Sequence, residues 1–139
     1  MTLTRRNLLG AIAILPAIRD AAAATPGSGR RMFVDAAFAM KRRAEQGGDQ
    51  PYGAVVVCGE TIVGWGPSRV VVDRDWSAHA ERVAIKDAQT RLGRADLSDC
   101  VMYSTSRPCV ACERAAASAR LGRMYFGADA ADAGPPSGG

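Results

Sequence analysis

The chain has 139 residues, enough for one domain and too few for a second independent hydrophobic core. Hydrophobic residues make up 47% of it and charged residues 23%, a balance typical of a folded globular protein and not of a disordered or fibrous one. The net charge is only +4, and Arg5, Arg6 and Arg19 against Asp20 carry +2 of it, so the rest of the chain offers no strongly basic face for nucleic acid.

The first 24 residues are typical of an export signal and not of a domain segment. Arg5 and Arg6 precede a short apolar run over residues 8–18, and the alanines at 22–24 supply small side chains for a cleavage point. The arginine pair resembles a twin-arginine export signal, and the apolar run is too short to span a bilayer. We therefore expect residues 1–24 to be removed during export, which predicts a periplasmic or secreted protein. A buried N-terminal helix is the alternative interpretation.

Residues 25–139 are expected to form one domain that begins with a helix and a hairpin. Apolar residues recur at helical spacing over residues 31–45, and the glycine pair at 47–48 ends that helix. Residues 52–66 contain two short β-rich runs separated by a Gly-Glu dipeptide, which indicates a β-hairpin.

A second helix is predicted over residues 77–92, with Ser77 as its N-cap and Gly93 as its end. Pro108 is typical of a first helical turn and predicts the start of a third helix. The remaining elements are a strand, this third helix and a final strand, over residues 100–106, 108–122 and 123–128. This alternation predicts a layered α/β architecture with parallel pairing where a helix connects two strands. Residues 128–139, which include "GPPSGG", are expected to be a disordered tail.

The chemistry concentrates in His79, the only histidine, and in Cys109 and Cys112. Cysteines three residues apart share one face of a helix, and a helix start stabilises thiolates. Two thiolates and a neutral imidazole make a three-ligand zinc set with an open fourth position, which is the catalytic pattern. Zinc lowers the pKa of a bound water toward neutrality, and Glu81 is the candidate proton carrier beside it.

His79 and Glu81 lie two residues apart, which in the middle of a helix would direct them to different sides. Both can reach one ion only if that ion lies over the N-terminus of the helix. The metal hypothesis therefore requires a helix that starts near Ser77.

Two other interpretations concern the cysteines. A strand, a C-x-x-C motif and a helix are also the context of a thioredoxin-like redox site, but that hypothesis leaves His79 and Glu81 unexplained. Cys58 and Cys100 fall in β-rich runs, and we expect them to be buried free thiols and not a second site.

The segment "HAE" followed by "PCVAC" resembles the H-x-E…P-C-x-x-C signature of the zinc-dependent cytidine and deoxycytidylate deaminase superfamily. The segments "PYGAVVV", "DWSAHAERVAI" and "LGRMYFGADAADA" resemble its purine-acting branch, which includes bacterial guanine deaminases and tRNA adenosine deaminases. Together these segments cover residues 32–133. The resemblance implies a three-layer α/β/α fold with a mixed sheet, shortened at its C-terminal end.

The resemblance also implies an activity. His79, Cys109 and Cys112 would bind Zn²⁺, and Glu81 would move protons while a ring amine of a nucleobase or nucleoside is replaced by oxygen and released as ammonia. Guanine is the leading substrate prediction, and the near-neutral chain after the signal argues against a tRNA substrate. Relatives usually pair, so we expect a homodimer, with no membrane association once the signal is removed.

Substrate contacts are predicted at Ser68, Ala54, Ala80 and Trp76. Ser68 stands where relatives often have an asparagine that grips the base, and a serine hydroxyl forms fewer hydrogen bonds than an amide. Ala54 offers backbone groups, Ala80 follows the predicted zinc histidine, and Trp76 could stack on a base. Arg107 stands where many relatives have glutamate and reverses a charge beside the metal. These departures and the short tail leave open a zinc-binding protein that has lost catalysis.

Overall fold

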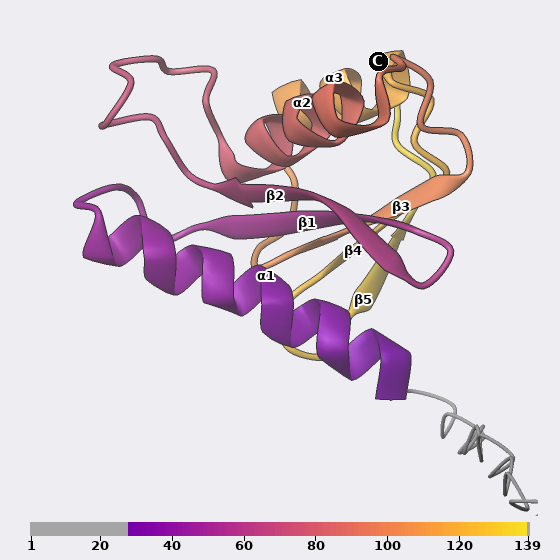
Figure 1. The fold of residues 1–139 in the computed structure, drawn as a ribbon, viewed down its shortest axis with the longest axis horizontal. Helices are drawn as coiled ribbons and strands as arrows, with labels where there is room; N and C mark the ends of the chain where they lie inside the picture. Colours follow the sequence, from indigo (N-terminus) through magenta and orange to yellow (C-terminus); the bar gives the residue numbers. More distant parts are fainter. Residues whose placement is uncertain (1–27, 139) are drawn as a thin grey trace, which may run out of the picture.

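The computed structural model describes residues 28–138, so the export signal expected at residues 1–24 lies outside the described residues. Within these described residues, three helices and five strands follow one another (Figure 1). They are α1 (Ser28–Gln46), β1 (Gly53–Cys58), β2 (Thr61–Pro67), α2 (Ala80–Leu92), β3 (Cys100–Ser104), α3 (Val110–Ser118), β4 (Arg123–Phe126) and β5 (Ala131–Gly134). Within the described part of the chain, no helix is long and apolar enough to cross a membrane.

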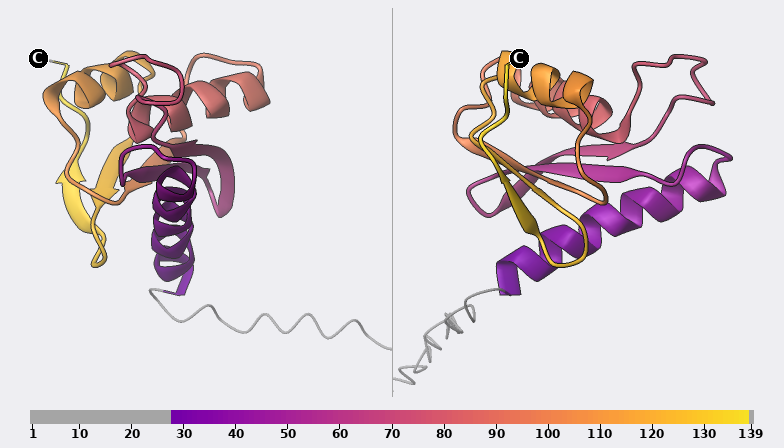
Figure 2. Two further views of the ribbon diagram at one scale, coloured as in Figure 1. Left: turned by 90° about the vertical axis from the view of Figure 1, so that its left-hand side faces the viewer. Right: turned by 180° about the vertical axis from the view of Figure 1, so that it is seen from behind.

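The strands form one mixed sheet in the order β2-β1-β3-β4-β5. Among the five described strands, only β3 and β4 pair in parallel, and α3 connects them, as the sequence predicts for a helical crossover. Helix α1 covers one face of the sheet, and α2 and α3 lie side by side on the other (Figures 1 and 2). The expected three-layer α/β/α fold with a mixed sheet is confirmed.

Strand β1 supplies side chains to both layers, because successive residues of a strand face opposite sides of the sheet. Ala54 and Val56 belong to the buried cluster under α2 and α3. Val55 and Val57 belong to the cluster under α1. All four are fully buried or nearly so, which explains why the run "AVVV" is apolar at every position and does not alternate.

Glycines on β2 let α2 approach the sheet closely. A Cβ atom added at Gly66 would collide with the backbone oxygen of Ala80, and one added at Gly64 would collide with that of Ala84. Since both obstacles are helix backbone, a rotamer change cannot relieve the collision. Glycine at these two positions therefore allows the first turns of α2 to lie directly against β2.

The expected start of the second helix at Ser77 is wrong by three residues. Helix α2 begins at Ala80, and its N-cap is His79, which has extended backbone angles. Ser77 does not cap the helix because its hydroxyl and its N–H both donate to the carboxylate of Asp75, at 2.6 and 2.8 Å. This Asx-type turn keeps the chain non-helical until His79. Gly93 ends the helix in the left-handed region, as predicted.

The third helix also begins later than expected. Its first residue is Val110 and its N-cap is Cys109, so Pro108 precedes the helix and does not lie in its first turn. Strand β5 lies within residues 128–139, which were expected to be disordered. It forms because Asp132 pairs with Arg123 of the neighbouring strand at 2.8 Å and accepts a hydrogen bond from the Gly134 N–H.

Candidate metal centre and active site

The N-termini of α2 and α3 place one metal-binding side chain each at the same point. His79 and Cys109 are the two N-caps, and neither side chain makes a capping hydrogen bond to its own helix. Nδ1 of His79 lies 3.6 Å from Sγ of Cys109 and 3.4 Å from Sγ of Cys112, one turn into α3. These donor atoms all lie within 4.8 Å of one another and could hold one metal ion.

The spacing of these atoms fits zinc. With Zn–S near 2.3 Å and Zn–N near 2.0 Å, two ligand atoms on a tetrahedral centre are separated by roughly 3.6 Å. The two nitrogen–sulfur distances, 3.6 and 3.4 Å, are of that size. Burial and the nearby Glu81 carboxylate raise the pKa of the Cys112 thiol, so a cation that takes the place of the proton would stabilise the thiolate.

Glu81 lies in the first turn of α2 and is only 6% exposed. Its carboxylate accepts a hydrogen bond from Sγ of Cys112 at 3.5 Å, and it does not belong to the group of donor atoms that could share a metal. Burial raises the pKa of this carboxyl group above its usual range. A buried carboxyl group next to a candidate metal group, but outside it, is suited to carry a proton.

A cavity of about 710 Å³ opens over the metal group. His79, Glu81 and Cys109 contribute to its wall, and its other lining residues are Gln50, Pro51, Tyr52, Val70, Trp76, Ala80, Ser106 and Arg107. The predicted contacts Trp76 and Ala80 thus line the cavity. Trp76 is 85% exposed, so the face of its ring is free for a ligand to stack on. A larger cavity of about 900 Å³ on the outer side of α2 contains none of the metal group.

The structure does not bring the other two predicted contacts to the cavity wall. Ser68 is buried, and its hydroxyl donates to the carboxylate of Asp49 at 2.9 Å. Ala54 lies in the middle of the sheet, where it pairs with Gly66 of β2 and Ser104 of β3.

Asp49 is a structural residue of the site that the sequence analysis did not single out. Its carboxylate accepts hydrogen bonds from Ser68 and from the N–H groups of Gln50, Val71 and Val72. It therefore ties the segment before the metal histidine to the end of α1. Partial burial acts to raise the pKa of Asp49, but these four hydrogen bonds together outweigh it and lower the pKa. Nothing local in the sequence marks Asp49, because three of its four partners lie 19 to 23 residues away.

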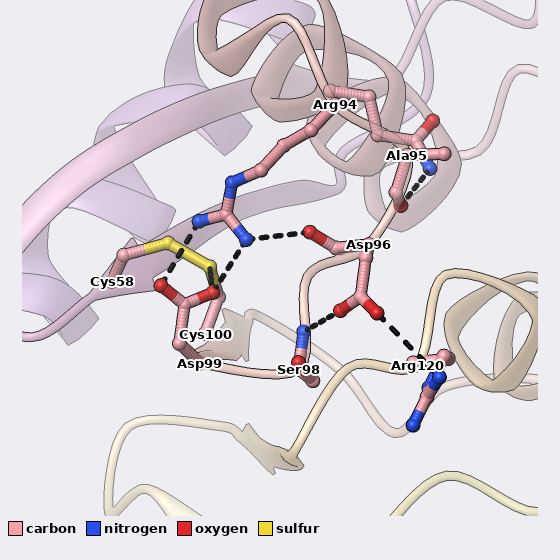
Figure 3. A network of polar contacts seen from close by, with 9 residues as sticks. Cys58, Arg94, Ala95, Asp96, Ser98, Asp99, Cys100 and Arg120 are labelled. Carbon is pink, nitrogen blue, oxygen red and sulfur yellow. Dashed lines mark hydrogen bonds and ion pairs between the residues drawn. A yellow bond between two sulfur atoms is a disulfide. The ribbon is translucent and has the colours of Figure 1, made fainter.

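The expectation of buried free thiols at Cys58 and Cys100 is wrong. The two residues are directly opposite each other on β1 and β3 and form a disulfide (Figure 3). The disulfide occupies both sulfurs, so this pair does not form a second metal site. Cys109 and Cys112, in contrast, are free. Beside the disulfide, Arg94 pairs with Asp99 at 2.9 Å, and Arg120 pairs with Asp96 at 3.6 Å.

The fold and the site together define a class of protein. An α/β/α domain with a histidine and two cysteines at two helix N-termini, and an unligated buried glutamate beside them, has the parts of a metal-dependent hydrolase. Residues 28–128 match the cytidine and deoxycytidylate deaminase zinc-binding region. The chain therefore belongs to this zinc-binding deaminase family.

Two of the relatives differ in the substrate that their names give. The chain is 36% identical over 89 residues to a tRNA-specific adenosine deaminase of Buchnera aphidicola subsp. Schizaphis graminum, a match that covers 64% of this chain and 59% of the relative. It is 39% identical over 87 residues to a guanine deaminase of Bacillus subtilis, covering 60% of this chain and 56% of the relative. The chain thus spans a little over half the length of these curated relatives.

Two of the solved structures similar to this chain differ in the same way, by the kind of deaminase that they represent. A structure from work on tRNA:A34 deaminases superposes with a TM-score of 0.68 at 32% identity and covers 70% of this chain and 75% of its own. The guanine deaminase from Bacillus subtilis superposes with a TM-score of 0.67 at 33% identity and covers 70% of this chain and 62% of its own. The two TM-scores are nearly equal, so both structures support the same fold for this chain. They do not distinguish between the two substrates.

Proposed function

We propose that this protein is a zinc-dependent deaminase that hydrolytically replaces a ring amine of a purine base, as the free base or in a nucleoside, and releases ammonia. A guanine-type base is the favoured substrate. The observation that carries the proposal is the convergence of His79, Cys109 and Cys112 at two helix starts, with the buried Glu81 carboxyl beside them.

The residues divide the work as follows. His79, Cys109 and Cys112 would hold the zinc ion, which when bound supplies the Lewis acidity that makes water a nucleophile near neutral pH. Glu81, held at the cavity wall, takes a proton from the attacking water and delivers a proton to the departing amine. The aromatic faces of Tyr52 and Trp76 at the cavity wall offer a base a surface to stack on.

Charge favours a small substrate over tRNA. Net charge outside residues 1–24 is only +2, whereas a protein that grips a folded RNA neutralises several phosphates with lysine and arginine. Arg107 is the only basic side chain other than His79 that lines the cavity over the metal group. We therefore propose a nucleobase or nucleoside as the partner, and no nucleic acid.

The test is ammonia release from purine bases and nucleosides by the zinc-loaded wild type and by Glu81→Gln. Glutamine keeps the shape but cannot carry the proton, so kcat should fall by about 100- to 10,000-fold while one zinc per chain is retained. The matched control is Glu113→Gln, which should keep both zinc and activity. Glu113 lies in the first turn of α3 and does not line the cavity.

Three other outcomes would each mean something different. Equal ammonia release from the wild type and Glu81→Gln would show that Glu81 is not the proton carrier. A zinc-loaded wild type that releases no ammonia from any base or nucleoside would indicate a zinc-binding protein without catalysis. A metal-free protein with a reducible Cys109–Cys112 disulfide would indicate thiol–disulfide chemistry. In the structure both cysteines are free thiols and form no such disulfide.

We also propose that the protein is exported by its N-terminal segment. The Cys58–Cys100 disulfide supports this proposal independently of the signal-like sequence, since structural disulfides persist in oxidising compartments and are rare in reducing ones. Cell fractionation followed by N-terminal sequencing tests it: a periplasmic or secreted chain that begins near residue 25 is expected, and a full-length chain in the cytosol would contradict it.

A further inference from the structure

One charged side chain at the cavity has no role in holding the metal or moving the proton. Of the residues that line the cavity, His79 and Cys109 belong to the metal group and Glu81 is the proton carrier. Arg107 is the only other charged residue in the wall, so once these three are assigned, the entrance carries a single positive charge.

That charge is available to a ligand. The guanidinium of Arg107 lies over the ring of Phe126, 5.3 Å from the ring centre, and the side chain is exposed. No carboxylate within residues 28–138 pairs with it, whereas six other arginines of this part of the chain have one. An aromatic face supports a guanidinium without neutralising it, so all its N–H groups remain free to donate.

The backbone beneath Arg107 is held in place. The hydroxyl of Ser104 donates to the backbone oxygen of Ser106 at 2.8 Å. The N–H of Thr105 donates to the backbone oxygen of Gly53 at 2.9 Å, and Gly53 donates back to the Thr105 hydroxyl at 3.2 Å. Pro108, the next residue, is buried. These contacts fix the point from which the guanidinium extends, two residues before the metal-binding Cys109.

We infer that Arg107 binds a phosphate group on the sugar of the substrate, and that the protein prefers a purine nucleoside monophosphate to the free base or nucleoside. This inference rests on the proposed deaminase function and names the substrate class of the same site. The planar guanidinium matches a phosphate with two parallel hydrogen bonds. A single cation suits a mononucleotide, whereas an RNA substrate would need a track of several.

The experiment compares kcat/KM for guanine, guanosine and guanosine monophosphate with the full zinc-loaded chain. Removing a charge-assisted hydrogen-bonded pair typically costs about 10- to 100-fold in affinity. We therefore expect the wild type to prefer the monophosphate to the nucleoside by about that factor, and Arg107→Gln to bring the ratio close to one. Arg107→Lys should keep part of the preference. The matched control, Arg114→Gln on the exposed side of α3, should leave the ratio unchanged.

A second readout separates this inference from the proposed function. Trp76 at the cavity entrance should report binding of the same three ligands by its fluorescence, whether or not turnover occurs. Ammonia release with no preference for the phosphate, or a preference that survives in Arg107→Gln, overturns the inference and leaves the deaminase. Phosphate- and Arg107-dependent binding without ammonia release overturns the deaminase and keeps the phosphate site. Tighter binding of an RNA stem-loop than of the monophosphate also overturns the inference.

Discussion

At the scale of single residues, the site depends on side chains that are placed by contacts far away in the sequence. His79 can face the cysteines because the turn at Asp75 keeps the chain non-helical up to His79, whose own backbone is extended. Asp49 holds the segment that precedes this turn through Ser68, Val71 and Val72. Neither aspartate touches the metal group, yet both position the segment that carries its histidine.

Replacing Asp49 should make this dependence measurable. Asp49→Asn keeps one acceptor oxygen but loses the charge, so the free energy of unfolding near neutral pH should fall by about 1 to 2 kcal/mol. The hydrogen bonds lower the pKa of Asp49 below 3.8. Its charged form therefore stabilises the fold above that pH, and the contribution is lost as the pH falls through the lowered pKa.

Urea unfolding at a series of pH values checks this prediction. The gap between the wild type and Asp49→Asn should be largest near neutral pH and close as the pH drops below about 4. Asp129→Asn, whose side chain is exposed in the turn between β4 and β5, is the matched control and should show no such gap. A gap that stays constant down to the most acidic pH would contradict the assignment.

At the scale of elements, the site is set by how closely α2 packs on β2. Gly64 and Gly66 leave no side chain between strand and helix, and the backbone oxygens of Ala84 and Ala80 fill that space. The first turn of α2 contains Ala80 and Glu81 and follows directly on His79. A displacement of this turn therefore moves the proposed metal ligand His79 and the proposed proton carrier Glu81 together.

Gly66→Ala should displace the first turn of α2. The added methyl group meets helix backbone, so we expect a loss of about 3 kcal/mol in the free energy of unfolding and a lower zinc content. Gly29→Ala in α1, where the new methyl group would lie 3.9 Å from Phe33, is the control and should be neutral or slightly stabilising. Zinc content by atomic absorption and unfolding by circular dichroism measure both effects. Full zinc occupancy with unchanged stability in Gly66→Ala would contradict the close approach.

At the scale of the whole molecule, the disulfide joins two neighbouring strands that the chain connects through β2 and α2. Cys58 ends β1 and Cys100 begins β3, 42 residues apart in sequence. The bond therefore closes a loop that contains β2, α2 and the metal histidine, which restricts the unfolded chain more than a short loop would.

Loss of the disulfide should destabilise the folded chain by up to about 4 kcal/mol, the loop-closure value for a loop of this length. Guanidinium unfolding of the wild type with and without a phosphine reductant measures the effect. The control is Cys58→Ala combined with Cys100→Ala, which should unfold at the same denaturant concentration in both conditions. If the unfolding midpoint of the wild type were the same with and without reductant, the disulfide would not stabilise the folded chain.

The sequence by itself determined the parts of the protein that depend on short-range patterns. Helix α1, the β1–β2 hairpin and the end of α2 at Gly93 follow from local periodicity and turn chemistry. Cys109 and Cys112 are predicted as a metal-binding pair from their local C-x-x-C spacing, and His79 from the resemblance of "HAE" and "PCVAC" to a deaminase signature.

Only the tertiary structure decided which distant groups meet. The pairing of Cys58 with Cys100, the hold of Asp49 on Ser68 and the formation of β5 against β4 each join partners that no local pattern connects. The cavity wall belongs to the same category, since Arg107 reaches it from the β3–α3 connection and Trp76 from the turn before α2. Hydrogen bonds and disulfides form between neighbours in space, and the strand order of the sheet and the packing of the helices on it determine these neighbours.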